Sequence, residues 1–126
     1  MGYYANITES TFVISKENLD EASTRLSDFS KENELVSANW EQRNGRDVAE
    51  TVLIQMGFET SMDEDGLHID GFDGKLRDQD KCTEILTDIA TGVICWIGED
   101  AQEWRETYGG PYVSHATRSR EWIELG

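Results

Sequence analysis

The sequence predicts an α+β fold, with a mostly antiparallel sheet and about three helices packed on it, in one domain spanning residues 1–126. Two observations carry this prediction: three segments repeat apolar residues at the helical spacing, and several others alternate apolar with polar residues between turns. The length of 126 residues and the hydrophobic content of 37% suit one core, and the single proline marks no linker. A ferredoxin-like βαββαβ path with extra strands is one order that fits this pattern.

The three helices are identified by apolar residues that recur at steps of three and four. Ser15 is placed to cap the first helix. Asp47 and Glu50 form a capping-box-like pair at the start of the second helix, and Gly57 is expected to end it. The third helix runs from about Asp80. The expected inward-facing residues are Leu19, Ala22, Leu26 and Phe29 in the first helix, Val48, Val52, Leu53 and Met56 in the second, and Cys82, Ile85, Leu86 and Ile89 in the third.

Strands are expected at YYANI and TFVIS near the start, FETSM and LHIDGF in the middle, and VICWIG, EWRETY, YVSHA and EWIEL toward the end. Asp65 and Gly66 suit the two central positions of a hairpin turn, which would pair Met62 with Ile69. Strand alternation then gives an apolar face and a polar face. The apolar face carries Phe58, Met62, Leu67 and Ile69, and the polar face carries Glu59, Ser61, Asp63, His68 and Asp70.

The chain is strongly acidic, with 26 acidic residues against 11 basic ones and a net charge of −15. Residues 59–106 hold fourteen of the acids and four of the bases. Such a field repels nucleic acid and anionic lipid, and it favours encounter with basic surfaces. The start lacks the layout of an export signal and no apolar run approaches the roughly 20 residues that cross a bilayer, so we expect a cytoplasmic protein. Cys82 and Cys95 are then expected to be free thiols.

The stretch MDEDGLHIDGFDG suggests a metal site, but its spacing favours a turn. An EF-hand alignment with Gly66 at position 6 leaves Ser61 at position 1 and Phe72 at position 12, where a bidentate Glu is needed. His68 and His115 are too few for zinc, and His115 is interpreted as a surface strand residue. We therefore expect no metal, no cofactor, no catalytic residue and no enzymatic activity, while weak binding of a divalent ion to the hairpin stays open.

The segment WIGEDAQEWRETYGG predicts a second hairpin, in which Trp96, Trp104 and Tyr108 frame a tight acidic turn at Glu99 and Asp100. The simple interpretation is that Trp96 or Trp104 fills the core. The alternative is that one of these rings stays partly exposed among carboxylates, which is typical of aromatic anchors at protein interfaces.

Three pieces of the chain together resemble a group of small acidic phage-encoded proteins of unassigned function: MGYYA with TFVISKENLDEA, the GFET…DEDGLHIDGFDGK hairpin, and WIGEDAQEWR. The resemblance covers most of the chain. Its motifs are turns and hairpins, so it implies a phage protein in a bacterial host cell and transfers no active-site residue.

The leading functional hypothesis is a non-enzymatic inhibitor or modulator that presents acidic surface to a basic bacterial protein, such as a defence nuclease. Carboxylates two residues apart on a strand fall at about 7 Å, close to the spacing of phosphates along DNA, so an acidic sheet would mimic nucleic acid. This role needs the acidic side chains on one coherent patch. The expected partner-binding residues are Asp63, Glu64, Asp65, Asp70, Asp73, Glu99, Asp100 and Glu103, with Trp104 as an anchor.

The alternative hypothesis is a small-molecule-binding or sequestering protein, in which aromatic residues between sheet and helices hold a nucleotide-like molecule. An anionic ligand needs cationic partners. The few cations of the middle region are Lys75, Arg77, Lys81 and Arg105.

Overall fold

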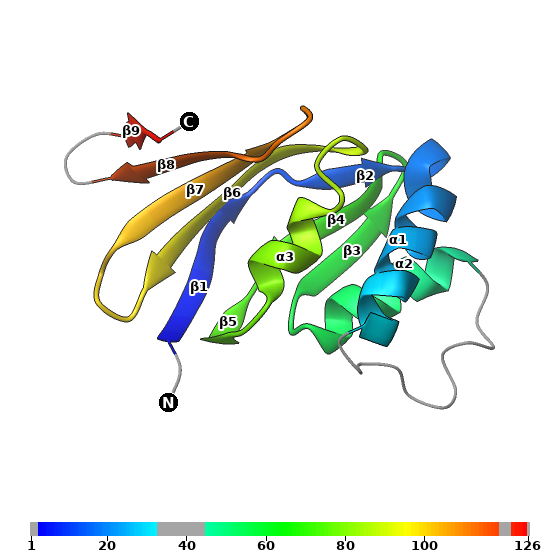
Figure 1. The fold of residues 1–126 in the computed structure, drawn as a ribbon, viewed down its shortest axis with the longest axis horizontal. Coiled ribbons are helices and arrows are strands. Elements are labelled where there is room, and N and C mark those ends of the chain that lie inside the picture. The colour runs from blue at the N-terminus through cyan, green and yellow to red at the C-terminus, as the bar shows by residue number, and fades with distance from the viewer. Residues whose placement is uncertain (1–2, 33–44, 119–121, 126) are drawn as a thin grey trace.

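The computed structural model describes residues 3–32, 45–118 and 122–125, which form three α-helices, one short 3-10 turn and nine strands (Figure 1). In chain order the elements are β1 (Tyr3–Ser10), β2 (Val13–Ser15), the 3-10 turn η1 (Lys16–Asn18), α1 (Leu19–Glu32), α2 (Gly45–Gln55), β3 (Glu59–Asp63), β4 (Gly66–Gly71), β5 (Asp73–Leu76), α3 (Gln79–Glu84), β6 (Ala90–Gly98), β7 (Glu103–Tyr108), β8 (Ser114–Arg118) and β9 (Trp122–Glu124).

The predicted α+β class is confirmed, because the helices pack on a curled antiparallel sheet. Neighbouring strands follow the order β3-β4-β2-β6-β7-β8-β9, and β1 lies between β5 and β6. Every pairing among the described strands is antiparallel. The ferredoxin-like path with extra strands is also observed. The elements β2, α1 with α2, β3, β4, α3 and β6 follow one another as βαββαβ, and their four strands lie in the order β3-β4-β2-β6, each antiparallel to its neighbour. The extra strands are β1, β5, β7, β8 and β9.

The strands β1 and β2 form one bent strand that runs beside β6. At the bend, Phe12 is fully buried. Gly92 of β6 has a φ of 106°, and a Cβ at this position would lie 2.2 Å from the carbonyl oxygen of Thr11. Only glycine fits such a close approach. The bend lets β1 pair with β5 at one end while β2 pairs with β4 at the other.

The core lies between the helices and the inner face of the sheet, the face that carries Ile94 and Trp96. The helices α1 and α2 pack on each other, on β2 and on β3, and α3 crosses the middle of the sheet in Figure 1. All eight inward residues predicted for the first two helices are buried, as are Cys82 and Leu86. Both cysteines are free thiols, as expected. Among the residues described, no helix is both long and apolar enough to cross a membrane.

The helix ends differ in detail from those predicted. Ser15 precedes the 3-10 turn instead of α1, and its side chain makes no capping hydrogen bond. The helix α2 starts at Gly45, before Asp47, whose side chain is not among those described. Gly57 follows α2 with a φ of 97°, which agrees with the predicted stop. The helix α3 ends at Glu84, and successive turns then lead to β6.

The β3–β4 hairpin has a different turn from the one predicted. Glu64 and Asp65 are the turn residues, and Gly66 already belongs to β4. Gly66 has a φ of 136°, and a Cβ there would lie 2.0 Å from the carbonyl oxygen of Ile14 on β2. The predicted turn at Asp65 and Gly66 is therefore wrong, because the close approach of β2 requires the glycine inside the strand.

The shifted turn changes the pairing but keeps the two faces. Met62 pairs with Leu67 instead of Ile69. Phe58, Leu67 and Ile69 are buried as predicted, whereas Met62 is 39% exposed at the edge of the sheet. The apolar face of the hairpin is thus covered beside β2 and open along β3, which is the end strand in the order of the sheet.

Candidate functional site

The nine residues predicted to bind a partner lie in separate parts of the sheet. They divide into a hairpin group at the β3–β4 turn, formed by Asp63, Glu64 and Asp65, and a turn group at the β6–β7 turn, formed by Glu99, Asp100 and Glu103. Of the other three, Asp70 lies near the end of β4, Asp73 begins β5, and Trp104 belongs to β7.

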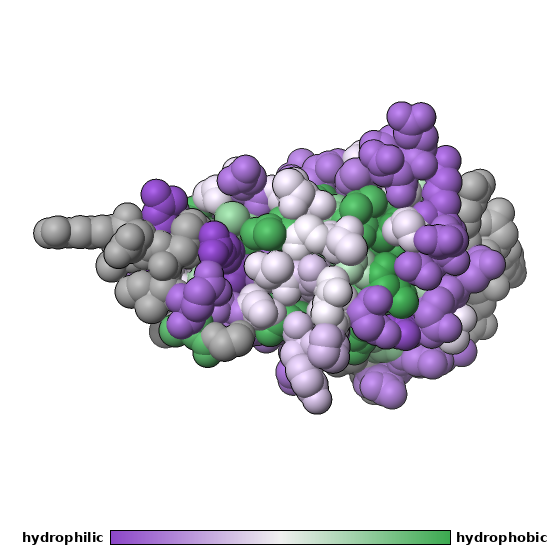
Figure 2. Space-filling model, turned by 90° about the horizontal axis from the view of Figure 1, so that it is seen from above, coloured by the Kyte–Doolittle hydropathy of each residue, from purple (hydrophilic) through white to green (hydrophobic). Residues whose placement is uncertain are grey.

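The hairpin group and the turn group lie at opposite ends of the bent β1–β2 strand. Gly66, beside the hairpin group, pairs with Ser15, and Gly98, beside the turn group, pairs with Ala5. Ala5 and Ser15 are ten residues apart, which in a straight strand corresponds to roughly 30 Å, and the bend shortens this distance. The expectation of one coherent acidic patch is therefore wrong. Figure 2 shows hydrophilic side chains gathered mainly over the end of the molecule that carries α1 and the hairpin tip.

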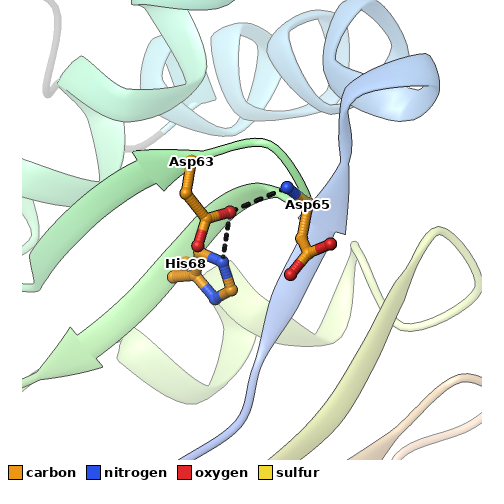
Figure 3. A group of neighbouring side chains, drawn as sticks. All are labelled: Asp63, Asp65 and His68. Carbon is orange, nitrogen blue, oxygen red and sulfur yellow. Dashed lines mark hydrogen bonds and ion pairs between the residues drawn. The ribbon is translucent and has the colours of Figure 1, made fainter.

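The hairpin group is held in place by Asp63 (Figure 3). Its Oδ1 accepts hydrogen bonds from the backbone N–H groups of Asp65 at 2.8 Å and Gly66 at 3.3 Å, and it lies 2.9 Å from Nε2 of His68. These contacts, with His68 first, lower the pKa of the Asp63 carboxyl. Asp63, Asp65 and His68 each bring a possible ligand atom within 4.8 Å of the others, but Ca²⁺ takes about six to eight oxygens. The arrangement stabilises a turn.

The turn group is bonded to the start of β1. The hydroxyl of Tyr3 donates to Oδ1 of Asp100, which also accepts the backbone N–H of Gln102 at 3.1 Å. The bond to Tyr3 is the main reason that the pKa of Asp100 is lowered, and it raises the pKa of Tyr3 to about 12. The backbone N–H of Glu99 donates to the Tyr4 carbonyl oxygen at 2.8 Å. The turn is therefore part of the sheet's own bonding.

A cleft that was not predicted lies on the inner face of β6–β8. Leu76, Arg77, Gln79 and Asp80, from the end of β5 and the start of α3, form one wall, and Trp96, Trp104, Glu106 and His115 form the other. Its volume is about 350 Å³, within the range of small-molecule sites. A smaller hollow of about 130 Å³ adjoins it and shares Asp80, Glu106 and His115.

Glu106 is a carboxyl group buried in the wall of this cleft, with an exposed fraction of only 5%. Its Oε1 accepts a hydrogen bond from Nε1 of Trp96 at 2.8 Å and lies 3.1 Å from the hydroxyl of Tyr108, which in turn lies 2.8 Å from Oγ1 of Thr83. Within the described part of the chain, no group donates to Oε2. The buried side-chain atoms without a partner among the described residues are Ser30 Oγ and Thr87 Oγ1, so Oε2 of Glu106 keeps contact with solvent and is an acceptor that a ligand can reach.

The charge state of Glu106 is set by opposing influences. Burial raises the pKa of its carboxyl, whereas the hydrogen bonds from Trp96 and Tyr108 and the nearby His115 act in the opposite direction. The charge of Asp80, on the facing wall, adds to the effect of burial. Perturbed carboxyl groups inside clefts are typical of binding and catalytic sites.

Two tryptophans line the cleft beside Glu106. Trp96 is 3% exposed and packs edge-on against Phe72 at a centroid distance of 5.5 Å. Trp104 is partly exposed and stacks on Trp96, with the centroids 5.9 Å apart and the ring planes 7° from parallel. Trp96 therefore fills the core, as the first interpretation of this hairpin held, and Trp104 stays partly exposed at the margin of the core, as the second held. Trp104 faces the cleft together with Glu106.

The sequence did not single out Glu106, and it led to the interpretation of His115 as a surface strand residue. In β7, Trp104, Glu106 and Tyr108 alternate with residues of the opposite face, and Glu106 is thus an acid on an otherwise aromatic face. An acid at the alternating position between two aromatic residues is the sequence pattern that could have identified Glu106. His115 pairs with Glu106 across β7 and β8, and although it is exposed, it lines the cleft. No sequence pattern near His115 indicates this position.

A larger cleft of about 440 Å³ lies between the end of α2 and β5, and it includes Lys75 and Arg77. Its buried polar side chain is Gln79, whose Nε2 donates to the Met56 carbonyl oxygen at 2.8 Å and whose Oε1 accepts the backbone N–H of Arg77. Both ends of this amide are already paired, so the larger cleft offers a ligand less than the Glu106 cleft does.

Comparison of the chain with protein-family models, with curated proteins and with solved structures finds no match.

Proposed function

We propose that the protein is a non-enzymatic small-molecule-binding protein whose ligand occupies the cleft between α3 and the inner face of β6–β8. The observation that carries the proposal is Glu106, a carboxyl group with an exposed fraction of 5% that lines the cleft beside Trp96 and Trp104 and whose Oε2 receives no hydrogen bond from the described residues. Burying such a group lowers stability unless something donates to it. A ligand that supplies the donor would offset this cost.

The aromatic wall supports the same proposal. Trp104 offers part of a large rigid surface at the cleft, and its position is fixed by stacking on Trp96 and by the Tyr3 ring at 6.2 Å. Small-molecule sites commonly combine such apolar surface with a few well-placed polar groups. Here Glu106 and Asp80 are acceptors and Arg77 is a donor.

The test is native mass spectrometry of the protein purified from cells, before and after incubation with a low-molecular-mass cell extract. We expect a non-covalent adduct on the wild-type protein that Trp104→Ala loses. Arg105→Ala is the matched control, because Arg105 is the next residue of β7 but lies on the opposite face, where it pairs with Glu124 at 2.6 Å. A wild-type protein that stays bare under both conditions, or an adduct that survives Trp104→Ala, contradicts the proposal.

A second candidate function is the acidic surface that binds a basic protein, and the hairpin group is the observation that favours it. The bonds of Asp63 fix the hairpin tip, which presents Glu64 and Asp65 in exposed positions. Because the turn group is far from the hairpin group, a partner protein that binds the hairpin group would not contact the turn group. Charge reversal at Glu64 and Asp65 should then abolish salt-sensitive capture of a basic host protein while reversal at Glu99 leaves it intact. Equal effects of the two reversals would count against this candidate.

A further inference from the structure

We infer that the cleft selects a planar organic cation, such as an amidinium or a protonated nitrogen heterocycle, whose N–H group donates to Oε2 of Glu106 while its ring lies along Trp104. This inference rests on the proposed function and names the chemical class of the ligand. It differs from the nucleotide-like ligand first expected, because the cations needed for phosphate lie elsewhere.

The distribution of charge around the cleft argues against an anion. Glu106 and Asp80 line the main cleft, and Glu84 lines the adjoining hollow. Arg77 is the guanidinium among the described lining residues, with His115 on the opposite wall. An anionic ligand would have to approach a buried carboxyl group, which costs more than any one exposed cation returns.

The other cations suggested for an anionic ligand are placed away from the cleft. Arg105 points to the outer face and pairs with Glu124 at 2.6 Å. Lys81 lies 3.8 Å from Asp78. Lys75 lines the larger cleft beyond α3. None of these three residues lines the Glu106 cleft.

The groups that do line the cleft suit a cation in two ways. Oε2 of Glu106 receives no hydrogen bond from the described residues, and hydrogen bonds that involve a charged group are about twice as strong as neutral ones. The indole of Trp104 adds an electron-rich face, which attracts cations held within about 6 Å of the ring centre. The net charge of −15 also raises the local concentration of cations around the whole molecule.

The test compares three probes of nearly the same shape, namely benzamidine, benzamide and benzoate, by calorimetry and by NMR shifts of indole N–H signals. We expect benzamidine to bind at least tenfold more tightly than benzamide or benzoate. Glu106→Gln keeps the shape and the acceptor for Trp96 but removes the charge, and it should reduce benzamidine affinity at least tenfold. Glu99→Gln removes one charge from the distant turn group and should leave that affinity unchanged.

Each outcome has a defined meaning. Benzamide or benzoate binding as well as benzamidine overturns the selection of a cation, and if that binding is lost in Trp104→Ala the proposed ligand cleft still stands. Equal losses in Glu106→Gln and Glu99→Gln would show only a general attraction of cations to an acidic protein and would also overturn the inference. If none of the probes binds, the inference fails, and native mass spectrometry separately decides the proposed function. Thermal unfolding of each variant confirms that it is folded.

Discussion

Trp96 donates a hydrogen bond from its indole nitrogen to Glu106, 2.8 Å away on the neighbouring strand. The same ring packs against Phe58 and Phe72 in the core. One side chain therefore belongs both to the hydrophobic core and to the wall of the cleft. The position of the Glu106 carboxyl depends on core packing, which makes the cleft a rigid feature and not a gap between loops.

The first prediction concerns this bond. Trp96→Phe removes the donor and leaves a small void in the core, so we expect the free energy of unfolding to fall by roughly 2–4 kcal/mol. Trp104→Phe, which changes a partly exposed ring whose nitrogen makes no such bond to Glu106, should cost about 1 kcal/mol or less. Urea unfolding of both variants measures the difference. Similar losses in the two variants would show that the hydrogen bond to Glu106 contributes little.

The second prediction concerns stability and pH. Because burial raises the pKa of Glu106 in the folded state, folding favours its protonated form. The stability that this gives is complete below the unfolded pKa of about 4.3 and is lost as the pH rises through the higher folded pKa. Glu106→Gln has no such loss. The melting temperature of Glu106→Gln minus that of the wild type should therefore increase from pH 4 to pH 7.

Differential scanning calorimetry at several pH values checks this prediction, with Glu103→Gln as the control. Glu103 belongs to the same strand and lies 3.9 Å from Arg118. Its replacement removes the same charge outside the cleft and should not show the same upward trend with pH. A relative melting temperature of Glu106→Gln that falls between pH 4 and pH 7 would contradict the unfavourable burial of the charged carboxyl. A variant that is more stable but binds no ligand would show that the wild-type residue is kept for binding.

The sequence predicted the helices better than the hairpins and the site. Helical spacing depends on many residues at once, so the buried faces of α1 and α2 could be identified without knowing their neighbours. The β3–β4 turn could not, because the position of Gly66 is decided by the carbonyl oxygen of Ile14 on a distant strand. The strand β5 was also missed, since DGKL has no apolar alternation and is a strand only because β1 pairs with it.

The acidic residues show the same limit more clearly. Sequence reasoning ranked carboxylates by their density along the chain and chose the two turns. The carboxyl group that distinguishes the cleft is instead Glu106, which is the acid on the aromatic face of β7. Burial depends on what the strand faces, and here Tyr108, beside Glu106, is bonded to Thr83 of α3, while His115 of β8 pairs with Glu106. Only the tertiary fold provides that information.

The third prediction tests the close packing of β4 on β2. Gly66→Ala forces a Cβ to within 2.0 Å of the Ile14 carbonyl oxygen at a positive φ, so the strands must separate. We expect a loss of roughly 2–4 kcal/mol in the free energy of unfolding. Gly74→Ala is the control, because the nearest atoms to its Cβ would be ring carbons of Phe72 at 3.8 and 3.9 Å. If Gly66→Ala leaves the free energy of unfolding unchanged, β4 does not pack closely on the Ile14 carbonyl of β2.

The fourth prediction concerns Asp63 at the hairpin tip. Its pKa is lowered by His68 and by the turn N–H groups, so its carboxylate stabilises the fold above the unfolded pKa of about 3.9, and this stabilisation is lost as the pH falls. Asp63→Ala should therefore lower the melting temperature at pH 6 and have a smaller effect at pH 3. Asp65→Ala, in the same turn, keeps the N–H donor to Asp63 and should have little effect at either pH. If the two alanine variants behave alike at pH 6, the tip is not held by Asp63, and the exposed acids of the hairpin group would then lack the fixed positions that binding to a basic partner needs.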